Sequence, residues 1–231
     1  MTAANIGCLK GLPVSLGGPG AEAAAKDCEA LGAKASGFAC DMTDEAQVEA
    51  AFDQARRAMG GLDILVNTAA WLDPPIPVHE MPKEVWDKSM NTDLTTVFLG
   101  CKHGLQIMVP QGTGGRVINM SSIAGRRGRA FRASYGAAKA AIINLSESVA
   151  LEVQQYGITV NAVCPGGVVG DRARNISRDL AERAGRTRED GDADYERARV
   201  NFVTEERVAD LIVFLASPAA DKITGQNIGI G

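Results

Sequence analysis

Three side chains near the middle of the chain have the types and spacing needed to move a proton at a carbon–oxygen bond. Tyr135 and Lys139 lie four residues apart, which would place them on one face of a helix, one turn from each other. Ser122 ends an apolar stretch thirteen residues before Tyr135, and a strand-to-helix return would bring its hydroxyl beside them. An ammonium group favours the phenolate form of tyrosine, and a serine hydroxyl can hold a substrate oxygen. The cluster therefore predicts general acid–base chemistry on an alcohol or a carbonyl group.

The segments that would position this cluster alternate between strand-like and helix-like patterns. Strands are expected at 12–16, 34–40, 62–67, 116–120, 158–164 and 227–230. Helices are expected at 21–31, from Thr43 as N-cap to Gly60, and at 82–109, 133–155 and 205–216. This alternation predicts an α/β fold, a doubly wound, Rossmann-like parallel sheet, in a single domain spanning residues 1–231.

The composition indicates one core and argues against several classes of protein. A chain of 231 residues with 45% hydrophobic content can bury one sizeable core. The net charge is −4, whereas a nucleic-acid-binding protein usually carries a basic surface, so this class is not expected. The sequence has no run of about eighteen apolar residues, so we expect no membrane span. It has no basic segment followed by an apolar stretch, so we expect no signal peptide.

The cysteines and histidines show neither a disulfide framework nor the spacing of metal ligands. The cysteines are Cys8, Cys28, Cys40, Cys101 and Cys164. They are scattered and odd in number, and His79 and His103 have no carboxylate or thiol at ligand spacing. We therefore expect free, buried thiols, a cytoplasmic protein and no metal site.

Residues 166–204 interrupt the alternation with a segment dense in both signs of charge. A solvated pair of helices would explain most of this composition. The segment also follows the carboxyl end of a strand, where open α/β sheets place their ligands, so it is a candidate lid over the substrate. The two interpretations are compatible.

Together with this cluster, several landmarks in a fixed order resemble the short-chain dehydrogenase/reductase family. They are Cys40-Asp41, Asp-Ile-Leu-Val-Asn at 63–67, the set Ser122, Tyr135 and Lys139, Asn-Ala-Val-Cys-Pro-Gly at 161–166, and Ile-Thr-Gly-Gln at 223–226. The resemblance runs from about residue 12 to the end of the chain. It implies hydride transfer between NAD or NADP and a small-molecule alcohol or ketone, with Tyr135 as general acid or base and no nucleic-acid or membrane partner. It also implies a homotetramer or homodimer, in which helices near 82–109 and 133–155 pack between subunits.

The fourth catalytic position of the family departs from the usual residue. The run Val-Phe-Leu-Gly at 97–100 follows Asp93-Leu94, where the family has Asn-Leu. The family uses the backbone carbonyl of this residue to hold a water molecule, and this backbone contact could survive the change to aspartate. The new carboxylate could also pair with Lys139 and weaken its effect on Tyr135.

The resemblance assigns cofactor contacts to seven further positions. They are Gly7, Asp41, Asn67, Ala69, Pro165, Gly166 and Val168, in addition to Tyr135 and Lys139. Asp41 would lie near the adenine and Pro165-Gly166 beside the nicotinamide. Ser15 stands where an acidic residue would bind a ribose hydroxyl, with no nearby arginine for a phosphate, so the choice between NAD and NADP stays open.

The N-terminal region fits the family least well. The glycine-rich turn Thr-Gly-x-x-x-Gly-x-Gly is represented by Gly7 alone, and too few residues separate Gly7 from the next strand for a parallel crossover. We therefore expect the first strand and its crossover helix to be missing or truncated. The alternative function is a non-catalytic, oligomerising member with a defective dinucleotide site. A lyase, isomerase or epimerase on this scaffold is a weaker third possibility.

A group of arginines lies between Ser122 and Tyr135. They are Arg126, Arg127, Arg129 and Arg132. A solvated basic turn would account for two or three of them. One that faces inward would favour an anionic substrate.

Overall fold

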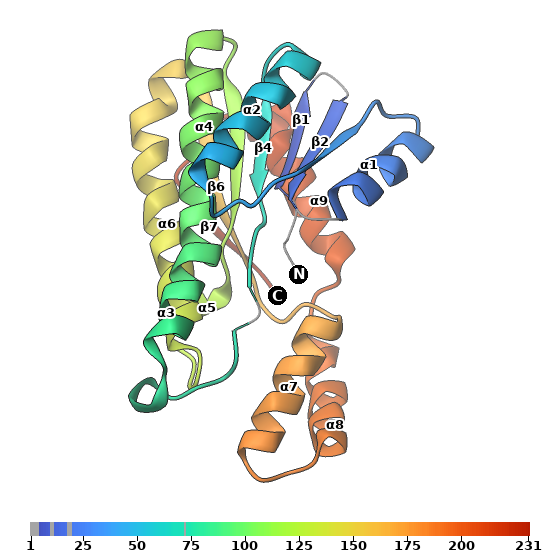
Figure 1. Ribbon diagram of the computed structural model, residues 1–231, viewed down its shortest axis with the longest axis vertical. Coiled ribbons are helices and arrows are strands. Elements are labelled where there is room, and N and C mark those ends of the chain that lie inside the picture. The colour runs from blue at the N-terminus through green and yellow to red at the C-terminus, as the bar shows by residue number, and fades with distance from the viewer. Residues whose placement is uncertain (1–4, 10–11, 18–19, 72) are drawn as a thin grey trace.

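The computed structural model describes residues 5–9, 12–17, 20–71 and 73–231, which form a seven-stranded sheet with helices on both faces (Figure 1). The strands are β1 (Asn5–Leu9), β2 (Leu12–Gly17), β3 (Ser36–Ala39), β4 (Ile64–Asn67), β5 (Gly115–Met120), β6 (Ile158–Pro165) and β7 (Asn227–Ile230). The helices are α1 (Gly20–Ala30), α2 (Glu45–Met59), α3 (Lys83–Ser89), α4 (Thr96–Gln111), α5 (Ile123–Arg126), α6 (Ala133–Val153), α7 (Asp171–Arg183), α8 (Arg188–Ala198) and α9 (Glu205–Ala216). The strand order is β3-β2-β1-β4-β5-β6-β7.

Six of the seven strands run in the same direction, which confirms the predicted doubly wound fold. β2 pairs with β3, and β4, β5, β6 and β7 pair in succession, all in parallel. β6 is buried along its whole length, as expected for a strand covered on both faces. Short parallel strands joined by helices bring the carboxyl ends of β4, β5 and β6 to one edge of the sheet.

β1 differs from the other strands because it runs antiparallel to both of its neighbours. Its residues pair with β2, from Leu9 opposite Leu12 outward, and with β4. Only two residues of sequence separate β1 from β2, so no crossover helix joins them. Among the described residues, the parallel first strand and its crossover helix are missing, as predicted, and the antiparallel β1 lies between β2 and β4.

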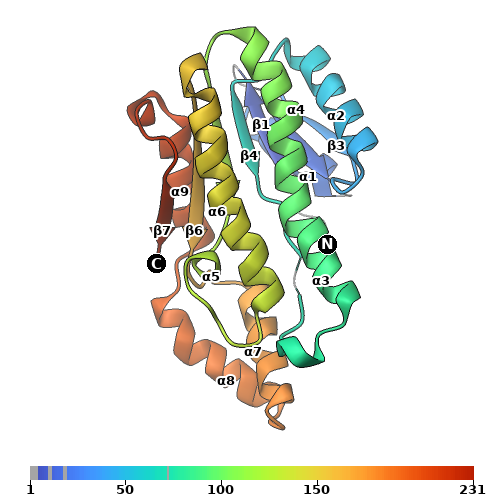
Figure 2. The same ribbon diagram turned by 90° about the vertical axis from the view of Figure 1, so that its left-hand side faces the viewer.

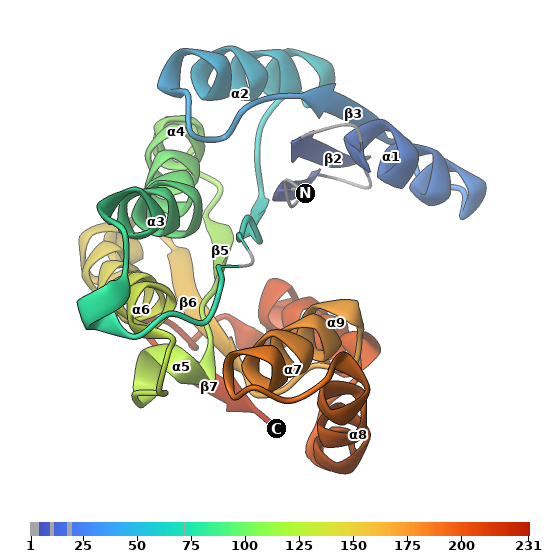
Figure 3. The ribbon, with the colours of Figure 1, turned by 60° about the horizontal axis from the view of Figure 1, so that its bottom comes forward.

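Two layers of apolar side chains pack on the two faces of the sheet. Helices α2, α4 and α6 cover one face, where Phe52, Val97 and Ile142 pack against Leu65 and other strand residues (Figure 2). Helices α1 and α9 lie on the other face (Figure 3). There Val208 and Leu215 of α9 pack against Val66, Ile118 and Val163. Neighbouring residues of one strand thus serve opposite cores, as the alternation of a strand requires.

Two helix boundaries differ from the predicted ones. The N-cap of α2 is Asp44 and not Thr43, because the Asp44 carboxylate accepts hydrogen bonds from the backbone N–H groups of Ala46 and Gln47. The predicted helix 82–109 is divided into α3 and α4 by a π-helical turn at Met90–Thr95. Such turns often occur at functional sites, and this one contains Asp93.

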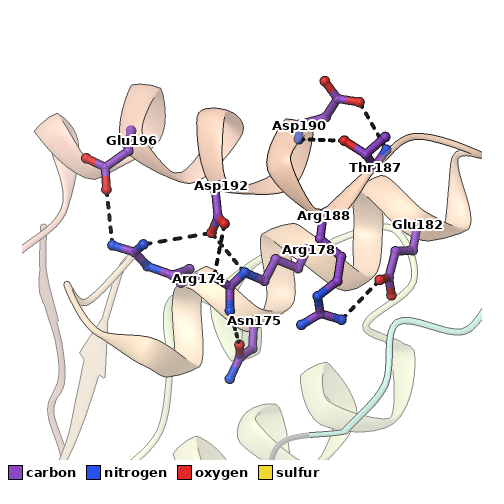
Figure 4. A network of polar contacts seen from close by, with 9 residues as sticks. All are labelled: Arg174, Asn175, Arg178, Glu182, Thr187, Arg188, Asp190, Asp192 and Glu196. Carbon is purple, nitrogen blue, oxygen red and sulfur yellow. Dashed lines mark hydrogen bonds and ion pairs between the residues drawn. The ribbon is translucent and has the colours of Figure 1, made fainter.

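Helices α7 and α8 form a pair beyond the carboxyl edge of the sheet, in the lower part of Figure 1. Ion pairs join the two helices, as Figure 4 shows for Arg174 with Glu196 and for Arg178 with Asp192. A capping box between Thr187 and Asp190 starts α8. Many of the charges of these two helices thus form ion pairs with each other. We name the helices the lid pair (residues 171–198), after the lid predicted for residues 166–204. Among the described residues, no helix is long and apolar enough to cross a membrane.

Candidate active site

The carboxyl ends of β4, β5 and β6 carry most of the predicted site residues. Asn67 is the last residue of β4, Ser122 follows β5, and Pro165 ends β6. The lid pair lies on the same side of the sheet (Figure 3). This arrangement places the candidate site in the usual ligand position of an open α/β sheet.

Tyr135 and Lys139 lie on the same face of α6, one turn apart. The Lys139 ammonium nitrogen is 5.6 Å from the centre of the Tyr135 ring and donates a 3.0 Å hydrogen bond to the Met120 carbonyl oxygen. Lys139 is 1% exposed, whereas Tyr135 is half-buried. A buried cation is thus fixed between the end of β5 and a tyrosine that solvent and ligands can reach.

Ser122 is held close to this helix by a glycine and a neighbouring serine. Its hydroxyl oxygen caps α5 by accepting a 3.1 Å hydrogen bond from the Ala124 N–H. The Ser121 hydroxyl donates to the Lys139 carbonyl oxygen at 2.7 Å. A Cβ added at Gly125 would stand 2.6 Å from the Lys139 carbonyl carbon, so only glycine permits this approach. The β5–α5 turn and α6 therefore form one packed unit.

Asp93 lies beside Lys139, fully buried. One carboxylate oxygen, Oδ1, is 3.9 Å from the Lys139 ammonium and accepts a 2.9 Å hydrogen bond from the Trp71 N–H. The other, Oδ2, accepts from the Ser89 hydroxyl at 3.4 Å. Burial raises the pKa of Asp93 above its ordinary value, and the nearby Lys139, the Trp71 N–H and Arg172 oppose that rise only in part. The carboxyl group at the family's asparagine position is thus buried, and its neighbours only partly offset the cost of burying its ionised form.

A second buried ion pair, missed by the sequence analysis, lies close to Tyr135. The Arg132 guanidinium contacts the Asp73 carboxylate at 2.7 Å and donates to the Asp73 carbonyl oxygen at 2.8 Å. The Ser134 hydroxyl donates to the same carboxylate at 3.0 Å. The Arg132 guanidinium carbon also lies 4.6 Å from the centre of the Tyr135 ring. The signal in the sequence was Asp73 itself, a lone acid in the apolar stretch 71–76.

The predicted cofactor residues at β4 and β3 have structural roles in the described chain. Asn67 is fully buried, and its side chain donates to the Asn119 side chain at 2.8 Å, which ties β4 to β5. Ala69 is buried just beyond β4. The exposed Asp41 carboxylate accepts hydrogen bonds from the Thr43 N–H and hydroxyl and so shapes the entry to α2.

The remaining predicted residues follow β6. Pro165 ends the strand, and the Gly166 N–H donates to the Ile230 carbonyl oxygen at 2.9 Å. Val168 forms an isolated parallel bridge with Val203. These contacts fix the loop that leads from β6 into the lid pair, so the loop is shaped before any ligand arrives.

Gly7 does not form the glycine-rich turn that the resemblance implied. It lies within β1, paired with Val14 on one side and Leu65 on the other, so its backbone belongs to the sheet. The residues predicted to contact the nicotinamide end of a dinucleotide lie at the carboxyl edge: Tyr135 and Lys139 on α6, Ser122 after β5 and the Pro165-Gly166 loop after β6. Among the described residues, the centre of the sheet offers no glycine-rich turn between a parallel strand and a helix for the pyrophosphate.

The chain is similar to known dehydrogenases and reductases. A family model described as enoyl-(acyl carrier protein) reductase matches residues 14–230. The cis-4-hydroxycyclohexanecarboxylate dehydrogenase of Sinomonas cyclohexanicum is 35% identical, over 91% of this chain and 81% of its own length. The sorbitol dehydrogenase of Cereibacter sphaeroides is 33% identical, over 96% of this chain and 87% of its own length.

Similar crystal structures come from the same group of enzymes. NAD⁺-bound xylitol dehydrogenase superposes with a TM-score of 0.84 at 26% identity, covering 90% of this chain and 83% of that one. A variant of actinorhodin polyketide ketoreductase with NADPH gives a TM-score of 0.85 at 28% identity, covering 93% and 84%. Since the match to the family model extends over nearly the whole chain, the protein belongs to the short-chain dehydrogenase/reductase family of NAD(P)-dependent oxidoreductases.

Proposed function

We propose that this chain oxidises a small alcohol, or reduces the corresponding ketone, with Tyr135 as the residue that moves the proton. The observation that carries the proposal is the buried Lys139 ammonium, 5.6 Å from the Tyr135 ring at the carboxyl edge of the sheet. A cation held there favours a phenolate that accepts the proton of an alcohol. In the direction of reduction, the phenol donates that proton to the carbonyl oxygen.

The other residues of the site hold the reacting groups in place. The Ser122 hydroxyl would bind the substrate oxygen beside Tyr135, and Lys139 would hold the ribose of the cofactor while it polarises the phenol. The Pro165-Gly166 loop and Ala69 would contact the nicotinamide end, and Asp41 the adenine. The bound dinucleotide, NAD or NADP, supplies or accepts the hydride.

The substrate class rests on similar proteins. Relatives are named for hydroxy acids and sugar alcohols, among them cis-4-hydroxycyclohexanecarboxylate and sorbitol. We propose a small alcohol or ketone of this kind, positioned over Tyr135. Trp71 lies next to the site, half-buried, and its ring would give the substrate an apolar wall.

We also propose a homotetramer or homodimer that works in the cytoplasm. Phe98 of α4 is 46% exposed and Leu151 of α6 is 71% exposed, so each of these two helices carries an uncovered apolar side chain. The cysteines that the structure describes are free thiols, which suits a reducing compartment. Size-exclusion chromatography with light scattering would measure the mass, and a monomer at micromolar concentration would refute the assembly.

A second candidate function is the non-catalytic, oligomerising protein. The antiparallel β1 favours it, because this strand takes the place of the strand and turn that would cradle a pyrophosphate. The intact set of Ser122, Tyr135 and Lys139 favours the enzyme. The two candidates differ in a direct way: only the enzyme must bind the dinucleotide.

The test is a titration of the purified full chain with NADH and NADPH, followed by nicotinamide fluorescence and calorimetry. We expect micromolar binding of one of them, and oxidation of the bound cofactor when 4-oxocyclohexanecarboxylate or cyclohexanone is added. Tyr135→Phe should lower kcat about 100-fold or more with cofactor affinity unchanged. Tyr156→Phe, at an exposed tyrosine away from the site, is the control. A folded sample that binds neither cofactor would refute the proposed dehydrogenase and favour the non-catalytic candidate.

A further inference from the structure

The lid pair contributes one arginine to the candidate site. Arg172, the second residue of α7, has its guanidinium carbon 5.6 Å from the centre of the Tyr135 ring. Its Nη2 donates a 2.7 Å hydrogen bond to the Trp71 carbonyl oxygen, 101 residues earlier in the chain. The side chain therefore bridges the lid pair and the β4–α3 loop directly above the tyrosine.

Arg172 also differs from every other arginine between residues 166 and 204. The other seven each form an ion pair with a carboxylate: Arg174, Arg178, Arg183, Arg186, Arg188, Arg197 and Arg199. Arg172 forms none with the described residues. To the residues that the structure describes, its guanidinium donates one hydrogen bond, the one to Trp71. The rest of its five N–H donors are therefore available to a ligand.

The charges around Tyr135 leave an excess of positive charge. Three cations, Lys139, Arg132 and Arg172, face two carboxylates, Asp93 and Asp73. The Asp73 carboxylate forms its ion pair with Arg132. In the buried Asp93, one carboxylate oxygen accepts from the Trp71 N–H and the other from the Ser89 hydroxyl. Arg172 is the cation of this group whose side chain is exposed. An anion that enters the site would meet it first.

The arginines between Ser122 and Tyr135 do not fill this role. Arg126, at the end of α5, and Arg127 and Arg129, in the loop after it, are exposed, whereas Arg132 is buried and paired with Asp73. One of the four arginines is therefore buried, and its charge is already paired with a carboxylate.

We propose that Arg172 binds a carboxylate or phosphate group of the substrate and so makes this site selective for anionic alcohols and ketones. The inference rests on the proposed function, because it places the anion on the molecule that Tyr135 acts on. A guanidinium edge matches two anionic oxygens at once, which gives orientation as well as affinity. Since Arg172 lies on the lid pair, the same contact would hold α7 over a bound substrate.

The test measures binding and does not depend on turnover. Calorimetry with the full chain compares cyclohexanecarboxylate and cyclohexyl phosphate with the neutral cyclohexanecarboxamide. We expect one or both anions to bind the wild type about 10- to 100-fold more tightly than the amide, and Arg172→Ala to remove that preference. Arg172→Lys should keep part of it. The matched control is Arg183→Ala, which removes a lid arginine that pairs with Glu80 on the same loop.

Three outcomes overturn the proposal. They are equal binding of anion and amide by the wild type, an anion preference that survives in Arg172→Ala, and a loss in Arg172→Ala that falls on the Kd of NADH or NADPH and not on the probes. The last would assign Arg172 to the cofactor. Anion binding that depends on Arg172, without oxidation of NADH or NADPH by any oxo acid, would leave this inference standing and remove the proposed function.

Discussion

The Asp93 carboxylate lies 3.9 Å from the Lys139 ammonium, and both side chains are almost completely buried. The two side chains have different hydrogen-bond partners. Lys139 also donates to the Met120 carbonyl oxygen, whereas Asp93 depends on Trp71 and Ser89. The pKa of Asp93 is raised despite the neighbouring cation, so the attraction between the two groups does not fully offset the burial of the carboxylate.

The raised pKa of Asp93 predicts that the effect of Asp93→Asn on stability depends on pH. A carboxyl group whose pKa is raised on folding binds its proton more tightly in the folded state, so its contribution to stability falls as pH rises above its ordinary pKa of 3.8. Asparagine cannot ionise, and its amide oxygen can still accept from the Trp71 N–H. The free energy of unfolding of Asp93→Asn, relative to wild type, should therefore increase from pH 4 toward pH 8.

Urea unfolding at several pH values measures this difference. Asp53→Asn, at an exposed aspartate, serves as the control and should show a nearly flat difference. A difference for Asp93→Asn that stays constant or shrinks with rising pH would contradict the prediction.

Breaking the buried Asp73–Arg132 ion pair should lower the free energy of unfolding more than breaking an ion pair on the surface. Both side chains are buried, and burial lowers the pKa of Arg132 against the opposing effect of Asp73. Removing one partner leaves an unpaired charge inside the protein, so Arg132→Met should reduce the free energy of unfolding by about 3–5 kcal/mol. Adding Asp73→Leu to Arg132→Met should recover part of that loss. Arg56→Ala, at the exposed pair with Asp53, should change stability by about 0.5 kcal/mol or less.

The measurement is a double-mutant cycle by urea unfolding, read together with kcat. Because Arg132 also lies over the Tyr135 ring, its loss should lower kcat more than the loss of Arg56 does. Additive effects of the two buried substitutions would show that Asp73 and Arg132 do not act as a pair.

Much of the fold could be predicted from patterns that depend only on local sequence. The apolar runs at β4 and β6 and the helix spacing around Tyr135 and Lys139 gave the right elements, since burial and periodicity are local properties. The pairing of β1 was beyond such reasoning. Gly7 resembles a turn residue in its own segment, and only its registers with Val14 and Leu65 show that it belongs to a strand.

The candidate site shows the same limit. The order of Ser122, Tyr135 and Lys139 indicated the chemistry, but no local pattern indicated that Arg172 would reach Tyr135. That contact depends on where the lid pair lies relative to β4. A pairing of the Asp93 carboxylate with Lys139 was one of two possibilities for this position, and the structure adds the Trp71 N–H, a partner that only the fold supplies.

Gly125 should be intolerant of alanine because α5 and α6 touch there. A methyl group at Gly125 would stand 2.6–2.8 Å from backbone atoms of Lys139 and Ala140, which cannot rotate away. Gly125→Ala should therefore destabilise the protein by about 1–3 kcal/mol and lower kcat, since the turn that carries Ser122 must move off the helix that carries Tyr135. Gly128→Ala, three residues on in open space, should change neither quantity. Loss of stability with an unchanged kcat would show that Ser122 is positioned independently of this contact.

The buried thiols should resist alkylation until the protein unfolds. Burial raises the pKa of Cys101 to about 12 and that of Cys40 to about 11, and it also raises the pKa of Cys164. The thiolate is the reactive form, so among the four cysteines whose side chains the structure describes, iodoacetamide at pH 8 should modify the half-buried Cys28 before the three buried ones. Peptide mass spectrometry after timed labelling, with and without guanidinium chloride, gives the order. Rapid labelling of Cys101 in the native protein would mean that α4 opens from β4 and β5, because that thiol lies between Asn67 and Asn119.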